Sequence, residues 1–332
     1  MYRSTSPAPV VVTGGAGYIG AVTVERLLAA GRPVRVLDTL LFGDESLAAL
    51  TANGALEVVR GDVRDRAALE RMCAGAAGVL HLAGLVGDPA CALDPALTRD
   101  VNVSSSAVLA AACRAAGVPR VVFASTCSVY GAAGDSWLDE NSPVAPVSLY
   151  AETNLESEGL LAEGLAGGPT GLTVLRFSTV YGVSPRMRFD LVVNLLTARA
   201  LRERVIEVHG GEQWRPQVHV DDVATALLLA LDEPAAAGRV YNVGSDELNL
   251  RIGTLAGRIA ARFPEARLTV SPTRDPRSYR VSFRRIREEL GFTPVHDLES
   301  GVDEIAAYLD HERAIDFRAA RYSNVKTLEA AL

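Results

Sequence analysis

Tyr150, in the segment SLYAETNLES, is a residue of a type that can take part in acid–base chemistry, and Asn154 follows it four positions later. On a helix this spacing puts both side chains on one face. A phenol with a pKa near 10 costs roughly 4 kcal/mol to ionise at pH 7. If position 154 carried a lysine, its ammonium would lie about 4–5 Å from the phenol and, at an effective dielectric near 20, would offset about 3–4 kcal/mol of that cost. Asn154 supplies a hydrogen-bonding amide but no charge, so the sequence predicts a phenolate that is only partly stabilised.

A glycine-rich turn near the N-terminus provides a second group of functional residues. The segment VVVTGGAGYIG carries Gly14, Gly17 and Gly20 between a predicted strand and a predicted helix. Such glycines allow a tight turn and close backbone approach to a pyrophosphate at the helix N-terminus. Asp38 ends the next predicted strand, where a carboxylate accepts from both ribose hydroxyls and repels a 2′-phosphate. The pattern predicts NAD as the cofactor rather than NADP.

Composition limits the classes of protein that fit. The 332 residues include 48% hydrophobic and 22% charged side chains, with a net charge of −7. These values indicate a globular protein and disfavour nucleic-acid and anionic-membrane partners. The sequence has no apolar stretch of about 20 residues, and the first apolar run is too short for a secretory signal. Its four cysteines lack metal-ligand spacing, so a reduced, cytoplasmic protein without a bound metal is expected.

The first half alternates β-branched runs with Ala/Leu-rich helical segments, which predicts a doubly wound parallel α/β sheet. Beyond about residue 181 the pattern changes to a smaller α/β region, in which 239–245 is a predicted strand and 300–310 the last predicted helix. We therefore expect two closely packed, interleaved domains, 1–180 and 181–332. The six strands predicted in the first half are 9–13, 33–38, 56–62, 78–84, 120–126 and 172–178.

Motifs along nearly the whole chain carry a family resemblance. TGGAGYIG, VLD, GDV, HLAG, STCSVYG and the Tyr150–Asn154 segment, with QWRPQVHVDDVA, YNVG and RSYR, together resemble the extended short-chain dehydrogenase/reductase family. Its members are NAD-dependent nucleotide-sugar epimerases, dehydratases and dehydrogenases. The resemblance implies a Rossmann-type NAD domain and a small sugar-nucleotide lobe. VGDPAC, SPRMRFDLVVN and RSYRVSF further resemble a branch that includes GDP-heptose 4-dehydrogenase-type enzymes.

The resemblance assigns roles to individual residues. Tyr150 is expected to take the proton from a sugar hydroxyl, with Thr126 as its hydroxyl partner, while Asn154 stands where the family keeps a lysine. That lysine also holds the nicotinamide ribose. The Asn154 amide can still hydrogen-bond a ribose hydroxyl but adds no charge, so we expect a bound cofactor and slow or narrowly tuned hydride transfer. The expected cofactor-binding residues are Gly14, Gly17, Tyr18, Ile19, Gly20, Asp38, Asp62, Val63, Leu82, Ala83, Gly84, Tyr150, Asn154 and Val180.

Substrate residues follow from the same resemblance. Arg215 matches the family arginine expected to bind the diphosphate, because a guanidinium fits phosphate in a bidentate manner, and Arg277 is the second candidate. Arg186 and Arg188 are expected to line the nucleotide pocket. The full set of expected substrate-binding residues is Val86, Thr126, Ser128, Arg186, Arg188, Asn194, Arg215 and Arg277. The expected partner is a nucleotide-diphosphate sugar that is GDP-, UDP- or CDP-linked.

The residues after Thr126 help to separate the family's activities. Dehydratases resemble Thr-Asp-Glu there, because eliminating water needs a second acid–base pair. This chain has Cys127 and Ser128 instead, which favours epimerisation or simple oxidation. Cys127 is expected to be a small buried residue, His81 a core histidine, and the 219–222 segment HVDD a helix cap rather than a metal site.

Two further expectations concern alternatives and assembly. Asn154 leaves open a catalytically weakened NAD-binding sensor or assembly protein of the same fold. The arginines of the second lobe argue against a sensor, which needs no diphosphate pocket. Helices 94–116 and 150–165 resemble the pair that forms a four-helix dimer interface in relatives, so a homodimer is expected.

Overall fold

A computed structural model of the chain describes residues 7–272 and 277–332. Seven strands form one parallel sheet in the order β3-β2-β1-β4-β5-β7-β11. Their carboxyl ends therefore share one edge, and the order reverses between β1 and β4, which is where ligands bind in such sheets. The predicted doubly wound sheet is confirmed. Its strands are β1 (Val10–Thr13), β2 (Val34–Asp38), β3 (Leu56–Arg60), β4 (Gly78–His81), β5 (Arg120–Thr126), β7 (Gly171–Phe177) and β11 (Arg239–Val243).

Helices cover both faces of this sheet, because the strands are apolar on both sides. In β1, Val10 and Val12 join the core cluster beneath α1 and α9, while Val11 joins the cluster beneath α3, α6 and α7. These helices are α1 (Tyr18–Ala29), α3 (Arg66–Cys73), α6 (Ser105–Ala116), α7 (Leu149–Leu165) and α9 (Val220–Asp232). Shorter elements between them are α2 (Glu45–Ala48), α4 (Asp88–Leu93), α5 (Pro95–Arg99), the π-helical turn η1 (Asp100–Ser104) and the 3-10 turn η2 (Cys127–Tyr130).

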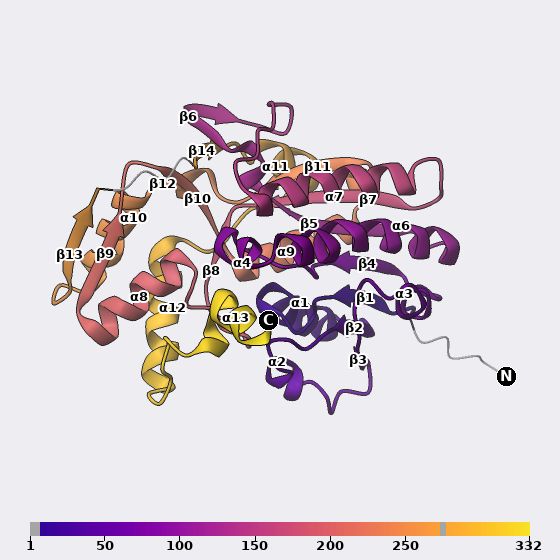
Figure 1. The fold of residues 1–332 in the computed structure, drawn as a ribbon, viewed down its shortest axis with the longest axis horizontal. Coiled ribbons are helices and arrows are strands. Elements are labelled where there is room, and N and C mark those ends of the chain that lie inside the picture. Colours follow the sequence, from indigo (N-terminus) through magenta and orange to yellow (C-terminus); the bar gives the residue numbers. More distant parts are fainter. Residues whose placement is uncertain (1–6, 273–276) are drawn as a thin grey trace.

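The second lobe lies beside the carboxyl edge of the sheet, on the left in Figure 1. It holds a three-stranded sheet, β12-β10-β8, and the pair β13-β9, while β14 pairs with β6. Its strands are β6 (Ala132–Leu138), β8 (Thr179–Tyr181), β9 (Val205–His209), β10 (Trp214–His219), β12 (Asn249–Arg251), β13 (Arg267–Ser271) and β14 (Ser278–Val281). Its helices are α8 (Val192–Glu203), α10 (Ile252–Arg262) and α12 (Leu298–His311), while α11 (Arg284–Leu290) packs against β11 of the large sheet.

The chain crosses between the lobes more than once. After β10, α9 packs against α1, and β11 pairs with β7 to complete the large sheet. The predicted strand at 239–245 therefore belongs to the first lobe. Tyr241 and Val243 are fully buried there. The prediction that 300–310 is the last helix is wrong: α13 (Asn324–Ala331) follows and returns to contact α4.

Candidate active site

One large cavity, of about 1080 Å³, lies at the carboxyl edge of the seven-stranded sheet. Among the described residues that line it, twenty were expected from the sequence. They are Gly14, Gly17, Tyr18, Ile19, Gly20, Asp38, Asp62, Val63, Leu82, Ala83, Gly84, Val86, Thr126, Ser128, Tyr150, Val180, Arg186, Arg188, Arg215 and Arg277. Asn154 and Asn194 were also expected there, but they are not among the described lining residues.

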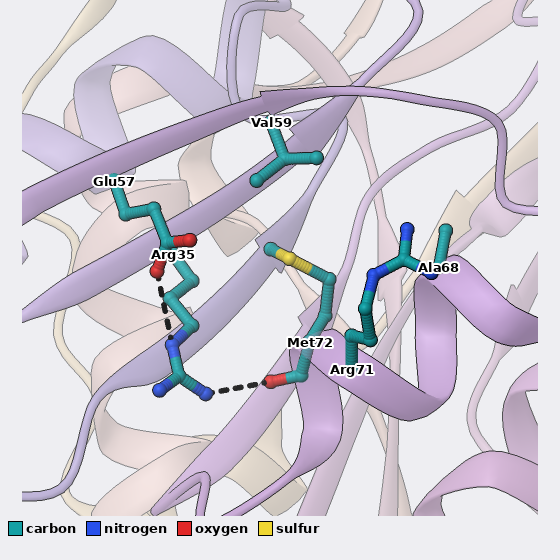
Figure 2. Close-up of a pocket in the computed structure, with 6 residues that line it drawn as sticks. All are labelled: Arg35, Glu57, Val59, Ala68, Arg71 and Met72. Atoms are coloured by element: carbon teal, nitrogen blue, oxygen red, sulfur yellow. Dashed lines mark hydrogen bonds and ion pairs between the residues drawn. The ribbon is translucent and has the colours of Figure 1, made fainter.

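A much smaller hollow, of about 170 Å³, lies between β2, β3 and α3 (Figure 2). Arg35 spans it, with Nε 3.2 Å from Glu57 Oε2 and a hydrogen bond of 3.1 Å to the carbonyl of Met72. Ligand pockets usually exceed about 300 Å³. This hollow is a gap in the packing of α3 against the sheet edge, and none of the candidate residues lines it.

The glycine turn requires glycine at two positions for steric reasons. Gly14 has φ +74°, and a Cβ there would lie 2.7 Å from the backbone nitrogen of Ala83. A Cβ on Gly20 would lie 2.1 Å from the Gly14 carbonyl oxygen, so this residue permits the close packing of α1 against the turn. Gly17 is the N-cap of α1. The first turn of α1 thus faces the cavity with its backbone, as an anion-binding helix N-terminus requires.

Asp38 lies at the end of β2 and accepts two backbone hydrogen bonds, from Ala16 at 3.0 Å and Leu40 at 2.8 Å. Burial raises its pKa, while these hydrogen bonds and the charge of Arg186 oppose the increase. Asp62, at the next strand end, forms an ion pair with Arg64 at 2.7 Å, and hydrogen bonding to Arg64 lowers the Asp62 pKa. Both carboxyl groups line the same cavity as the glycine turn.

The Tyr150 and Thr126 side chains lie together in the lining of the cavity. Burial raises the pKa of Tyr150, as do the nearby Cys91 and Asp88, whereas hydrogen bonding to the Thr126 side chain and the charge of Arg188 lower it. Ser148 caps α7, and its hydroxyl donates to Asp88 at 2.7 Å. The phenol is therefore held at the start of a helix, next to a second hydroxyl, in surroundings that favour its protonated form.

Asn154 directs its amide into the helix rather than into the cavity. Its Nδ2 donates to the Tyr150 carbonyl at 2.8 Å, and the side chain is buried. A short asparagine side chain readily makes this bond to the carbonyl four residues earlier. The described geometry therefore places this amide against its own helix, and Asn154 supplies no charge to the cavity.

One helical turn beyond Asn154, Glu158 begins a buried polar network. Its carboxylate binds Arg176 in a bidentate manner, at 3.0 Å and 2.7 Å, and accepts from Ser125. Arg176 also donates to the Tyr130 hydroxyl at 3.1 Å. The charge of Arg176 is thereby matched by a carboxylate. The network locks α7 onto β5 and β7, which position Thr126 and Tyr150.

Four arginines from the second lobe face the cavity in two groups. Arg277 forms an ion pair with Asp88, and Arg215 donates to the Arg277 carbonyl. Arg215 also lies over the ring of Tyr279, with its guanidinium carbon 5.4 Å from the ring centre. Arg188 pairs with Asp190 at 2.8 Å. Arg186 lies over the Phe42 ring at 4.1 Å and is close enough to Arg188 and Asp38 for their charges to interact.

Asn194 has a structural position instead of the predicted substrate contact. It is fully buried, its Oδ1 accepts from the Gly182 backbone at 3.1 Å, and its Nδ2 donates to the Arg188 carbonyl at 2.8 Å. It also donates to the hydroxyl of Tyr18, which itself donates to the Gly182 carbonyl at 2.6 Å. These bonds attach the loop after β8 to α1, and so Asn194 orients the lining residues from behind.

His81 and Cys127 have buried positions. His81 Nδ1 lies 2.7 Å from the Thr13 hydroxyl, and burial lowers the His81 pKa to about 4, so the ring is neutral at pH 7. The Cys127 thiol donates to the Arg176 carbonyl, and burial raises its pKa. The predicted roles as a core histidine and a small buried cysteine agree with this geometry.

The 219–222 segment caps α9. His219 Nδ1 accepts from the Asp221 backbone at 3.2 Å, and Nε2 lies 2.7 Å from Glu304. His219, Asp221 and His296 bring potential metal ligands within 4.8 Å of one another. Both nitrogens of His219 already have protein partners, and the helix cap is the role that the sequence predicted.

Sequence reasoning missed several residues that shape the site. Asn102, in the π-helical turn, clamps the loop after β4 through Leu85, with its Oδ1 2.8 Å from the Leu85 nitrogen. Asp88 and Tyr279 line the cavity beside Tyr150 and Arg215. The Ser128 hydroxyl lies 3.2 Å from the Tyr279 hydroxyl. The position of the VGDP segment after a predicted strand could have indicated that Asp88 lines the site. No local pattern places Tyr279 there, because the fold alone brings it close to Arg215.

Comparison with known proteins identifies the family. The model described as the NAD dependent epimerase/dehydratase family matches residues 10–244. The chain belongs to this family. A UDP-glucose 4-epimerase of Azospirillum brasilense is 30% identical, with 95% of each chain covered. A dTDP-glucose 4,6-dehydratase of Streptomyces griseus is 31% identical, and the match covers 92% of this chain and 95% of the relative.

Solved structures agree with this assignment. MoeE5 in complex with UDP-glucose and NAD is 30% identical, with a TM-score of 0.81 over 92% of this chain and 100% of that one. The relatives of this chain include both epimerases and dehydratases, so sequence similarity alone does not distinguish the two reactions. In the part of the chain that the structure describes, no helix is long and apolar enough to cross a membrane.

Proposed function

We propose that the protein is an NAD-dependent epimerase or dehydrogenase that acts on a secondary hydroxyl of a nucleotide-diphosphate sugar. The observation that carries the proposal is the continuity of one cavity. It joins the glycine turn, Asp38, the Tyr150–Thr126 pair and the arginines of the second lobe. A dinucleotide and a sugar nucleotide bound together in one cavity can bring the nicotinamide, the sugar carbon and the Tyr150–Thr126 pair into contact.

The residues fit a dinucleotide. Glycine at positions 14 and 20 permits the tight turn, because a Cβ at either would meet backbone atoms, and this turn leads into the start of α1, where a pyrophosphate would bind. Asp38 suits the ribose hydroxyls and Asp62 the adenine edge. The buried Arg186 has an Nε without a hydrogen-bond partner among the described residues. Bound NAD would supply a hydride acceptor at the sugar carbon.

The chain's own groups would move the proton. Tyr150 Oη would accept the hydroxyl proton of the sugar, and the Thr126 hydroxyl would hydrogen-bond the same oxygen to hold it in place. Since burial raises the Tyr150 pKa and Asn154 adds no charge, this base works best at alkaline pH. Arg215 and Arg277 would bind the diphosphate. Ser128 and Val86 would line the sugar site, and Cys127 is buried where a dehydratase needs an acid.

A direct test uses the purified protein. We expect NAD to be released on heat denaturation in near-stoichiometric amount, and UDP-glucose to be converted to its C4 isomer. UDP-glucose is the first probe because MoeE5 is solved with it and several relatives are UDP-glucose 4-epimerases. GDP-sugars, including GDP-heptose, and CDP-sugars follow. Isomers are separated by chromatography, and net oxidation is followed at 340 nm.

The alternative is an NAD-binding sensor or assembly protein, and the geometry of Asn154 is the observation that favours it. Bound NAD with no affinity for any of these sugar nucleotides in calorimetry would support the sensor and contradict the enzyme. We also propose a homodimer formed through α6 and α7, with the two domains at 1–180 and 181–332. Light scattering of the full chain tests the dimer.

A further inference from the structure

Both tryptophans of the chain belong to one stack of side chains on the second lobe, where β6, β14, β10 and β12 lie next to one another (Figure 1). Trp137 and Arg280 are partners across β6 and β14, with the guanidinium carbon 4.2 Å from the ring centre. Trp214 and Arg251 are partners across β10 and β12, at 5.1 Å. Arg280 also lies 4.5 Å from the Trp214 ring and joins the two pairs. Because a guanidinium is attracted to an aromatic face at such distances, the four side chains form one alternating unit, the Trp–Arg stack.

Charged and polar partners hold the Trp–Arg stack in place. The Trp214 indole nitrogen donates to the Asp135 carboxylate at 2.6 Å, and Arg251 lies 3.6 Å from the same carboxylate and also pairs with Glu212. The Arg280 guanidinium donates to the Asp135 carbonyl at 3.3 Å. Its Nε is buried without a hydrogen-bond partner among the described residues. The two rings and one carbonyl therefore fix the position of this guanidinium.

The Trp–Arg stack lies directly behind the part of the cavity that carries the candidate diphosphate ligands. None of its four side chains is among the described lining residues, yet three of them have a lining residue as their neighbour in the chain. These neighbouring pairs are Trp214–Arg215, Tyr279–Arg280 and Arg251–Ile252. Successive side chains of a strand point to opposite faces. In β10 and β14 the stack therefore occupies one face and the cavity lining the other.

Backbone hydrogen bonds connect the Trp–Arg stack to the candidate ligands. Arg215 Nη1 donates to the Trp214 carbonyl at 2.9 Å and to the Arg277 carbonyl. The Trp214 backbone nitrogen donates to the Ser278 hydroxyl at 3.1 Å, which ties β10 to the residue after Arg277. The position of the Arg215 guanidinium therefore depends on how β10 and β14 are held together, and Arg280 of the stack bridges these two strands.

We propose that the Trp–Arg stack positions Arg215 and Arg277 to bind the diphosphate of a sugar nucleotide. This inference rests on the proposed function. An arginine that is free to move loses side-chain entropy when it binds a ligand, and this loss weakens the affinity. The stack removes part of that cost before the ligand arrives. Its members are positioning residues, because none of them lines the cavity.

The test compares the affinity for a diphosphate before and after the stack is interrupted. UDP, GDP and CDP are titrated into the purified protein by calorimetry, and the nucleotide that binds most tightly is used with the variants. Arg280→Met keeps a long side chain but removes the cation between the two rings. We expect its Kd to be about tenfold higher, with NAD content and kcat at saturating sugar nucleotide within about twofold. Arg280→Lys restores a cation, so its Kd should lie within about threefold of the unmodified value.

Arg262→Met is the matched control. Arg262 is an exposed arginine on α10 of the same lobe, where it pairs with Asp303 and does not line the cavity. Its Kd should equal that of the unmodified protein. Tryptophan fluorescence gives a second readout, because both tryptophans are in the stack and the Trp214 carbonyl accepts from Arg215. We expect this fluorescence to change when the nucleotide saturates the unmodified protein.

A Kd for Arg280→Met within about twofold of the unmodified value would overturn the inference, even if the variant unfolds at a lower temperature. The stack would then stabilise the lobe without positioning the arginines. Unchanged tryptophan fluorescence at saturation would overturn it as well. If Arg280→Met does not fold, Trp137→Leu at the half-exposed end of the stack replaces it, and its Kd should increase in the same direction.

Failure of the stack and failure of the proposed function give different results. Nucleotide binding that weakens in Arg280→Met, without turnover of any sugar nucleotide, contradicts the sugar reaction only. Turnover by a protein whose Kd is the same in Arg280→Met contradicts the stack only. If none of the three nucleotides binds the unmodified protein, both proposals are wrong.

Discussion

Replacing Asn154 with lysine would place a cation one helical turn from Tyr150. The native amide is buried and bonded to the Tyr150 carbonyl, so a lysine ammonium there would be poorly screened by solvent. It would lie between the phenol and Glu158, whose carboxylate is already held by Arg176. We expect Asn154→Lys to lower the Tyr150 pKa.

The size of the effect follows from Coulomb's law. A unit charge about 4.5 Å from the phenolate, at an effective dielectric near 20, stabilises it by about 3.7 kcal/mol. That corresponds to about 2.7 pKa units. Attraction of the new ammonium toward Glu158 reduces its effect on Tyr150, and we expect a net decrease of about 1–2 units.

The assay is the pH dependence of kcat for isomer interconversion. Because burial raises the Tyr150 pKa, the rate of the unmodified protein should still be increasing with pH above about pH 9. In Asn154→Lys the increase should move about 1–2 units lower, and kcat at pH 7 should increase about 10- to 100-fold. Asn154→Gln, which adds length without charge, should leave the profile in place.

An unchanged rate and pH profile in Asn154→Lys would refute this electrostatic account of position 154. The same shift in Asn154→Gln would refute it in another way, because length rather than charge would then be responsible.

Three further outcomes are expected. Tyr150→Phe should lower turnover at least about 100-fold and leave the NAD content of the purified protein unchanged, which separates chemistry from cofactor binding. Gly14→Ala should abolish NAD retention, measured after heat release, since its Cβ would lie 2.7 Å from the Ala83 nitrogen at a φ of +74°. Arg176→Met should lower the free energy of unfolding in urea by about 3–5 kcal/mol, because it leaves the buried Glu158 carboxylate unpaired; a loss below 1 kcal/mol would contradict this.

The sequence predicted the sheet and its cofactor edge well because these features depend on local patterns. The six strands predicted in the first half all occur, with ends within a few residues. Strand–helix alternation and the right-handed crossover rule leave few other arrangements. The glycine turn, Asp38 and Thr126 occupy strand ends, and the carboxyl ends of parallel strands must share one edge. Their meeting at one cavity was therefore predictable.

Other features depend on contacts between distant segments. Nothing in the local sequence shows that Asn194 is fully buried behind the Arg188 backbone, or that Asn154 bonds to its own helix. Helix α13 follows a stretch with little apolar periodicity, and its position is decided by Asn324 meeting Val86, which lies 238 residues earlier. The packed structure, not the local sequence, decides which group an asparagine amide hydrogen-bonds to.

The return of α9 and β11 to the first lobe has a consequence for dissecting the protein. A fragment ending at residue 180 would lose both, which leaves β7 as an unpaired edge and uncovers Val174 and Leu175, buried in the whole chain. Exposed apolar edges of this kind recruit other chains and aggregate. Neither half should be obtainable as a stable separate product, and studies of one half must be carried out on the intact polypeptide.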